Sequence, residues 1–356
     1  MKIAVVRENL AGEARVAITP DAVKKYIALG ASVSVASGAG LGSAISDAEY
    51  EVAGASIADG VSDADIILSV RAPAENIIKQ AKDNAILVGM LDSFGKPEQI
   101  ELYKNQQINA FSLELLPRIS RAQSMDVLSS QSNLAGYRAV IEAVASFGKA
   151  VPMMMTAAGT IAPAKVLVLG AGVAGLQAIA TAKRLGAVVS AFDVRPVAKE
   201  QVESLGAKFI EVAAEETGET KGGYAKEMSD DYKRKQSELI AETIKKQDIV
   251  ISTALIPNRP APVLITEEMV KTMRAGSVIV DLAAASGGNC PLTELDQVAH
   301  KHGVTLIGYS NLPSRVAVDA SALYARNLYN FVSTLLVEKG AINVKWEDEL
   351  VKGTKI

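Results

Sequence analysis

The stretch KVLVLGAGVAGLQAIATAKRLGAVVSAFD, from Lys165 to Asp193, decides the fold class of this chain. β-forming residues lead into three glycines in G-x-G-x-x-G spacing, a helix rich in Ala and Leu follows, and a second apolar strand ends on an acid. Strand, tight turn, helix and strand in this order are the context that the dinucleotide fingerprint requires. The stretch predicts a Rossmann unit that binds a dinucleotide. The alternative is a glycine-tightened turn that binds nothing.

Each fingerprint residue has an expected role. Gly170 allows the tight turn, Gly172 lets the backbone approach a pyrophosphate, and Gly175 lets the helix pack close to the strand. The helix N-terminus supplies free N–H groups for the phosphates. Asp193 is the expected acceptor for the adenosine ribose, which favours NAD(H) over NADP(H) because a 2′-phosphate would meet a like charge. Arg195 could in principle receive that phosphate.

The composition excludes several classes of protein. The chain has 356 residues, a formal net charge of −3 and one cysteine, Cys290. No basic stripe indicates a nucleic-acid partner, and one cysteine cannot form an intrachain disulfide, which fits a reducing compartment. The N-terminus leads directly into a strand pattern without a signal peptide. The weakly polar region Val151–Ala182 is broken by Pro and Gly, and predicts two buried strand-like pieces and a helix, not a membrane span.

Strand and helix patterns alternate along the chain, which predicts an α/β fold with parallel sheets. We expect two Rossmann-like doubly wound domains: a discontinuous first domain, 1–127 and 316–356, and a nucleotide-binding domain, 128–315. Thr19 and Pro20 are suited to the N-cap and first position of a helix. The helix pattern Val316–Val337 could return the chain to the first domain.

Three further patterns predict local structure. A helical stripe that we expect to be core packing contains Leu134, Tyr137, Ile141, Val144 and Phe147. The AHKHG segment around His300 and His302 is expected to be a helix end. The tail Ala341–Ile356 is expected to form a hairpin that needs a partner surface, because an isolated hairpin is marginal.

The available chemistry is limited by the two histidines. A dehydrogenase that oxidises an alcohol or amine needs a general acid/base, but His300 and His302 follow the fingerprint by more than a hundred residues, and at i, i+2 they do not share a helix face as metal ligands would. We expect no metal site. Hydride transfer between two nicotinamide rings needs positioning and exclusion of water, and no proton donor. The segment Ala213–Glu238 is either a solvated loop with a charged helix or a lid over bound nucleotide.

Several long segments resemble one family. They are Leu116-PRISRAQSMDVLSSQSNLAGYRAV-Ile141, Pro152-MMMTAAG-Thr160, Gly175-LQAIATAKRLG-Ala187, Gly222-GYAKE-Met228, Thr253-ALI-Pro257, Ala261-PVLITEEM-Val270 and Gly287-GNCP-Leu292. The chain resembles the NAD(H)-binding soluble component, domain I of the alpha subunit, of proton-translocating NAD(P) transhydrogenase. The resemblance covers the chain from Met1 to about Asn330, and the RISRAQSMD and GGYAKEM segments are not general Rossmann features.

The resemblance implies a set of site residues. The loop beside the nicotinamide end would contribute Arg118, Ile119, Ser120, Gln123, Asp126 and Ser129. There Arg118 and Asp126 would help hold the nicotinamide and its ribose, and Gln123 would reach toward the NADP(H)-binding component. The other expected nucleotide-binding residues are Ala171, Gly172, Val173 and Gly175 at the pyrophosphate turn, Asp193, Val194 and Arg195 at the ribose, Gly223, Tyr224 and Gln236 in a mobile loop, and Leu255 at a strand end.

The family also implies an activity and an assembly. NAD(H) would bind to this chain and NADP(H) to a partner component, and hydride would pass directly from NADH to NADP⁺, coupled to proton movement through a membrane component. The implied stereochemistry is Si-specific on one ring and Re-specific on the other, and activity would require the partner components. We expect a homodimer whose C-terminal hairpin crosses to the partner, on the cytoplasmic face of the inner membrane. The chain end favours a separate subunit over an excised domain.

Two other functions remain open. Alanine dehydrogenase is a relative with the same two-domain plan, and Arg15 is common to both families. In that relative a Lys binds the substrate carboxylate and a His follows the next strand, whereas this chain has Arg71 and Asp92 in the comparable segments. Both departures argue against substrate oxidation. A nucleotide-sensing module would keep the fingerprint but would not need the RISRAQSMD loop.

Overall fold

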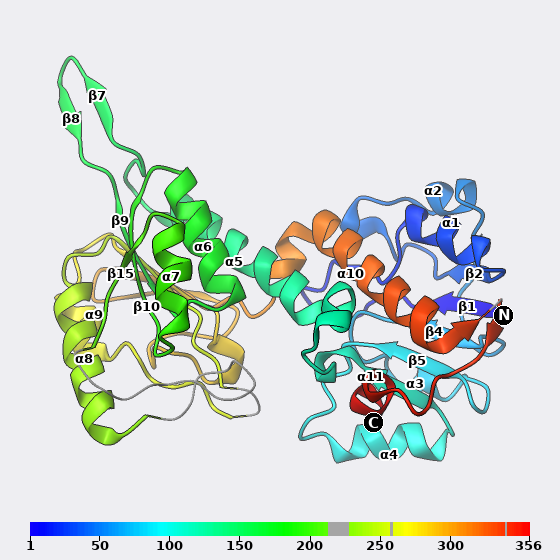
Figure 1. Ribbon diagram of the computed structural model, residues 1–356. Helices are drawn as coiled ribbons and strands as arrows, with labels where there is room; N and C mark the ends of the chain where they lie inside the picture. The colour runs from blue at the N-terminus through cyan, green and yellow to red at the C-terminus, as the bar shows by residue number, and fades with distance from the viewer. Residues whose placement is uncertain (213–227, 257–258, 339) are drawn as a thin grey trace. The chain divides into compact units, whose positions relative to one another are not determined.

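The computed structural model describes residues 1–212, 228–256, 259–338 and 340–356 (Figure 1). They divide into two compact units, Met1–Gln131 with Pro313–Ile356, and Ser132–Leu312. Helix α5 (Val127–Ser146) begins in the first unit and continues in the second. The predicted domain boundaries at 127/128 and 315/316 stay a prediction, because a compact unit need not fold alone.

The first unit is built on a six-stranded parallel sheet in the order β3-β2-β1-β4-β5-β6. Its strands are β1 (Lys2–Val5), β2 (Ser32–Val35), β3 (Ser56–Ile57), β4 (Ile66–Leu68), β5 (Ile86–Gly89) and β6 (Asn109–Ser112). Its N-terminal helices are α1 (Pro20–Ala28), α2 (Asp47–Val52), α3 (Glu75–Ile78) and α4 (Pro97–Asn105), with short 3₁₀ turns η1 (Leu41–Ser43), η2 (Leu113–Leu115) and η3 (Ser120–Met125).

Local sequence explains these elements. The central strands β4 and β5 are apolar at nearly every position and fully buried, as a parallel sheet covered on both faces requires. Helix α1 begins at Pro20, and the Thr19 hydroxyl accepts the N–H of Ala22, which confirms the predicted cap. Two buried hydrophobic clusters cover the sheet, because alternate residues of each strand point to opposite faces.

The second unit has a seven-stranded sheet in the order β11-β10-β9-β12-β13-β15-β14. Its strands are β9 (Lys165–Leu169), β10 (Val188–Phe192), β11 (Lys208–Phe209), β12 (Ile249–Ser252), β13 (Val278–Asp281), β14 (Val298–Lys301) and β15 (Val304–Ile307). Its helices are α6 (Val173–Arg184), α7 (Val197–Ser204), α8 (Asp230–Ile244) and α9 (Glu267–Thr272), with a 3₁₀ turn η4 (Ala284–Ser286). Both sheets reverse strand order in the 3-2-1-4-5 manner of doubly wound folds, so the predicted fold class is confirmed.

The chain returns to the first unit through η5 (Leu312–Val316) and α10 (Ala317–Phe331), which a π-helical turn extends over Val332–Leu336. Tyr324, Leu328 and Phe331 of α10 are buried in the first core. This return explains why the first unit is discontinuous.

The hairpin expected over Ala341–Ile356 is wrong for most of the tail. Only β17 (Ala341–Ile342) pairs, with β16 (Val337–Glu338), and the chain then forms helix α11 (Glu349–Thr354). Asp348 caps this helix, and its buried residues, Leu350, Val351 and Thr354, follow helical spacing. An alternating pattern over so few residues does not distinguish a strand from one helical turn.

The helix end predicted at His300 and His302 is also wrong. His300 lies in β14, the one strand of this sheet that pairs antiparallel, and it neighbours β15 at the sheet edge. His302 and Gly303 both adopt positive φ, 53° and 77°, and form the two-residue turn between β14 and β15. Such a turn matches the twist of an antiparallel pair, so x-Gly here is a hairpin signal.

The helical stripe expected on α5 is displaced. The buried residues are Ala139, Val140, Ala143 and Phe147, whereas Tyr137 is exposed. Small side chains form this face because α6 approaches closely: a Cβ on Gly136 would overlap the backbone of Ala174. The larger residues were therefore a poor guide to the buried face.

The two buried strand-like pieces expected between Val151 and Ala182 are only half right. β9 is buried, but β7 (Met154–Thr156) and β8 (Gly159–Ile161) form a hairpin exposed at every position. In Figure 1 this hairpin stands clear of the sheet of its unit. Within the described ranges, no helix has the length and apolarity that crossing a bilayer requires.

Candidate functional site

The turn between β9 and α6 has the backbone geometry of a phosphate cradle. Gly170 adopts φ +95°, which residues with a side chain rarely reach. Gly172 is the N-cap of α6 and offers no side chain to the first helical turn. A Cβ built on Gly172 would meet no described atom within 4 Å, so open space adjoins the helix N-terminus. Free N–H groups beside open space suit a pyrophosphate.

Gly175 and Thr253 hold this turn in shape. A Cβ at Gly175 would overlap the carbonyl oxygen of Gly170, so the helix can pack this close to the turn only with glycine at this position. The Thr253 hydroxyl, just after β12, donates to the same Gly170 carbonyl at 2.9 Å. The sequence interpretation gave Thr253 no role, although it begins one of the family segments. It joins the ends of β9 and β12, where the strand order reverses and ligands bind in such sheets.

Asp193 is less open than the fingerprint predicts. Its carboxylate accepts the N–H of Ala171 at 2.7 Å and the N–H of Arg195 at 2.9 Å. The Arg195 side chain adds two bonds, from Nε at 2.9 Å and Nη2 at 2.8 Å. A carboxylate has about four lone-pair sites, and these donors use them all. A ribose hydroxyl would therefore have to displace part of the Arg195 fork, and Arg195 is committed to Asp193 here.

The RISRAQSMD loop lies in the first unit and forms η3. Ala122 and Met125 anchor it in the core, while Arg118 and Gln123 are exposed. Asp126 caps α5: its carboxylate accepts the N–H of Ser129 at 2.9 Å and the Ser129 hydroxyl at 2.5 Å. The loop thus brings together the expected Asp126 and Ser129 and presents Gln123 outward. Ile119 packs against the first core, and Ser120 is exposed.

The remaining expected residues are distributed over the second unit. Val194 packs against a buried cluster, and Leu255 is exposed after β12. Gln236 is not in a loop, as expected, but is buried in α8, because Tyr232, Gln236, Ile240 and Ile244 repeat at helical spacing. Gly223 and Tyr224 lie outside the described residues, as does most of the possible lid. The pyrophosphate and ribose residues thus belong to the second unit, and the nicotinamide-loop residues to the first.

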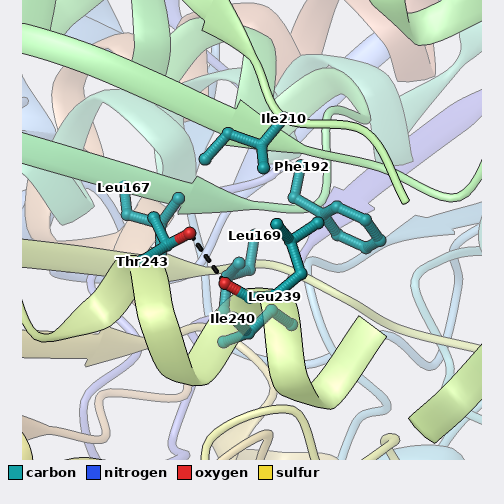
Figure 2. Close-up of a pocket in the computed structure, with 7 residues that line it drawn as sticks. All are labelled: Leu167, Leu169, Phe192, Ile210, Leu239, Ile240 and Thr243. Carbon is teal, nitrogen blue, oxygen red and sulfur yellow. Dashed lines mark hydrogen bonds between the residues drawn. The ribbon is translucent and has the colours of Figure 1, made fainter. Parts of the chain in front are cut away.

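A small gap beneath the fingerprint strands is not a ligand site. It encloses about 160 Å³ between the sheet and α8 and is lined by Leu167, Leu169, Phe192, Ile210, Leu239, Ile240 and Thr243. Figure 2 shows that its one hydroxyl, on Thr243, is directed back to the carbonyl of Leu239. Without a free polar group, the gap offers a nucleotide nothing to bind.

A buried charge cluster occupies the end of β1 in the first unit. Arg15 and Glu13 pair through two bonds, of 2.8 and 2.6 Å, and Gln131 accepts a third from Arg15 at 2.8 Å. Arg71 also reaches Glu13, at 3.2 Å. Burial raises the pKa of the neighbouring Glu8 to about 7. A substrate carboxylate would have to displace Glu13 from Arg15.

Asp92 stands where an alanine dehydrogenase is expected to carry a histidine. It has φ 47° and its N–H donates to the Glu114 carboxylate, while its own carboxylate pairs with Lys96 at 2.6 Å. The two histidines lie elsewhere: His302 contacts Glu267 at 2.9 Å, and His300 lies on the edge strand. Neither position offers an imidazole as proton donor at the end of β9.

Comparison with known proteins places the chain. The family model "Alanine dehydrogenase/PNT, N-terminal domain" matches residues 4–135, and the model of the C-terminal domain matches residues 139–356. The chain belongs to this family. Membership confirms that the glycine turn lies in a nicotinamide-nucleotide-binding fold.

Within the alanine dehydrogenase/PNT family, the transhydrogenase alpha subunits are similar over the whole chain. The first of the two alpha-subunit polypeptides of the Rhodospirillum rubrum NAD(P) transhydrogenase is 54% identical over 99% of this chain and 95% of its own. The Haemophilus influenzae "NAD(P) transhydrogenase subunit alpha" is 47% identical over 100% and 70%. A transhydrogenase structure from Sinorhizobium meliloti matches with a TM-score of 0.92 at 50% identity, covering 100% and 98%. The predicted resemblance is confirmed.

Alanine dehydrogenases of the same family are more distant. The Methanococcus maripaludis enzyme is 31% identical over 89% of this chain and 82% of its own. An L-alanine dehydrogenase structure matches with a TM-score of 0.78 at 22% identity, covering 99% of each chain, which shows the shared fold. The predicted kinship with alanine dehydrogenase is confirmed as well.

We expect Asp193→Asn to weaken NADH binding about tenfold, because hydrogen bonds to a charged acceptor contribute about 1.5–3 kcal/mol. The substitution removes the charge that orients Arg195 and the ribose. Titration calorimetry with NADH measures the change, and Asp230→Asn, at an exposed position in the first turn of α8, is the matched control. Unchanged affinity in Asp193→Asn would contradict the ribose assignment.

Proposed function

We propose that this chain is the NAD(H)-binding component of a proton-translocating transhydrogenase. Hydride passes directly from NADH on this chain to NADP⁺ on a partner component, coupled to proton movement through a membrane component. Family membership supports the transhydrogenase role, and the acidic Asp193 supports NAD(H) over NADP(H). The complex acts on the cytoplasmic face of the inner membrane, with Si-specific transfer on one ring and Re-specific transfer on the other.

The residues of this chain bind and orient. Bound NADH supplies the hydride. The first N–H groups of α6, beside Gly172, hold the pyrophosphate, and Asp193 receives the ribose hydroxyls as the Arg195 fork opens. Arg118 and Asp126 hold the nicotinamide end, where Asp126 is already oriented by its cap of α5. Gln123 faces the partner component and aligns the two rings.

One observation carries the proposal: the family-specific loop presents an amide, Gln123, where a dehydrogenase would need an acid/base. The Gln123 side chain is exposed and has no polar partner among the described residues. An amide cannot supply a proton at neutral pH, but it can donate and accept hydrogen bonds. Ring-to-ring transfer needs alignment and dryness only.

An absorbance assay of hydride transfer tests the proposal. The chain is mixed with NADH, a partner component loaded with NADP⁺, and an NAD⁺ analogue as reporter. We expect turnover only when the partner is present. Turnover of the chain alone with NADH, pyruvate and ammonia would instead identify an alanine dehydrogenase. NADH binding without turnover in either mixture would favour the nucleotide-sensing module.

We propose that the β7–β8 hairpin, and not the C-terminal tail, mediates the homodimer. Its outer residues Met153, Met154, Met155 and Ile161 are exposed, Met155 by 82%. A two-stranded hairpin is marginal by itself in water, and clustered exposed apolar residues mark interaction sites. The tail residues Leu350 and Val351, by contrast, are buried within the first unit.

Met155→Asp is expected to shift the chain from dimer to monomer at micromolar concentration. A charge buried in an apolar contact lacks compensation and costs several kcal/mol. Sedimentation velocity measures the mass, and Leu41→Asp, at another exposed apolar residue, serves as the control. A dimeric Met155→Asp would exclude the hairpin as the principal contact.

A further inference from the structure

Gln123 lies between two attachments of its own loop to the C-terminal part of the chain. The first is made two residues earlier by Arg121. Its Nη1 and Nη2 donate to the two carboxylate oxygens of Asp348 at 2.9 and 2.6 Å, and Nη2 also reaches Glu349 at 3.2 Å. A planar guanidinium on both oxygens of one carboxylate fixes orientation as well as distance.

The second attachment is made one residue after Gln123. The carbonyl oxygen of Ser124 accepts from the side-chain amides of Asn327 at 2.8 Å and Asn330 at 3.0 Å. These asparagines are three residues apart on α10, so both project from one face of the helix. A carbonyl with two lone pairs is thereby saturated.

Asn327 extends the attachment to α5. It is 7% exposed, and its carbonyl oxygen accepts the hydroxyl of Ser130 at 2.7 Å. Ser130 lies in the first turn of α5, which Asp126 caps. One buried amide therefore connects the backbone beside Gln123 with the helix start that holds Asp126.

We infer that Asn327, Asn330 and the Arg121–Asp348 pair are positioning residues for the hydride-transfer loop: they hold the backbone on both sides of Gln123 while its side chain stays available to the partner. The inference rests on the proposed function. It gives the C-terminal α10 and α11 a role in transfer geometry, because a displacement of about 1 Å costs about a hundredfold in rate.

Exposure separates this role from folding. The Arg121 side chain is 46% exposed, and exposed ion pairs contribute about 0–1 kcal/mol to stability. Asn330 makes its bond at the surface. Loss of either contact should therefore loosen the loop without unfolding the first unit.

The test uses Arg121→Lys, Asp348→Asn and Asn330→Ala in the full chain with its partner component. Asn at position 348 can still cap α11, since Asn is a good N-cap, but it loses the second charged oxygen. We expect kcat for hydride transfer to fall about tenfold in each variant, with the KM for NADH within about twofold of the wild type. The double variant of Arg121→Lys with Asp348→Asn should be no slower than either single one, because both remove the same contact.

Hydrogen exchange of residues 120–126 gives a readout that does not depend on activity. Exchange should be faster in the three variants and unchanged in Arg326→Ala, an exposed α10 residue beside Asn327. Exchange and kcat equal to those of Arg326→Ala would overturn the inference, as would a KM increase that accounts for the whole loss. If the wild type gives no transfer with the partner, the proposed function fails, and unchanged exchange alone then decides against the attachment role.

Discussion

Gly172→Ala is expected to lower NADH affinity by about tenfold or more, equivalent to about 1.4 kcal/mol, while thermal unfolding stays unchanged. The added methyl group meets no described atom within 4 Å, and Gly172 has φ −76°, which alanine adopts without strain. The protein therefore tolerates the methyl group, but a pyrophosphate at the N-terminus of α6 would not. Calorimetric titration with NADH and a thermal scan measure the two effects.

Gly175→Ala is the matched variant. Its methyl group would overlap the Gly170 carbonyl oxygen, so the turn or α6 has to move. We expect loss of NADH binding together with a lower melting temperature, since overpacking costs about 1–3 kcal/mol. The pair separates contact with the nucleotide from damage to the turn. Wild-type affinity in Gly172→Ala would mean that no phosphate passes there.

Gln123→Asn is expected to slow hydride transfer about a hundredfold while NADH binds as in the wild type. The amide retreats by one methylene, and misplacement of about 1 Å at the reacting centre has an effect of this size. Stopped-flow absorbance with an NADP⁺-loaded partner measures the rate, and fluorescence titration measures NADH affinity.

The matched control is Gln80→Asn, the same change at an exposed position in the first unit. It should leave both the rate and the affinity unchanged. Lost NADH affinity in Gln123→Asn would place this side chain in the NAD pocket and not at the contact between the two rings.

The sequence was a reliable guide where the structure is local. The phosphate cradle depends on Gly170, Gly172 and Gly175, which lie within six residues, so their spacing alone predicts the turn, the helix start and the close packing. The cap of α1 at Thr19 is equally local. His302-Gly303 was a local hairpin signal too, and we missed it by giving the basic residues more weight than the turn.

Tertiary contacts decided the rest. Asn327 and Ser124 are 203 residues apart in sequence, and Arg121 and Asp348 are 227 apart. No periodicity or spacing reports such a pair, because each partner reads locally as an ordinary polar surface residue. The same holds for the Arg195 fork on Asp193, where a short-range pair saturates an acceptor that the fingerprint leaves open.

By itself, the sequence determined the fold class, the phosphate turn and the family, because these are encoded in glycine spacing, apolar runs and long characteristic segments. Only the tertiary structure decided which residues hold the loop of Gln123, which small side chains of α5 are buried, and which hairpin remains uncovered. Those outcomes depend on side chains that meet only after the chain has returned through α10, and on which surfaces the packed core leaves exposed.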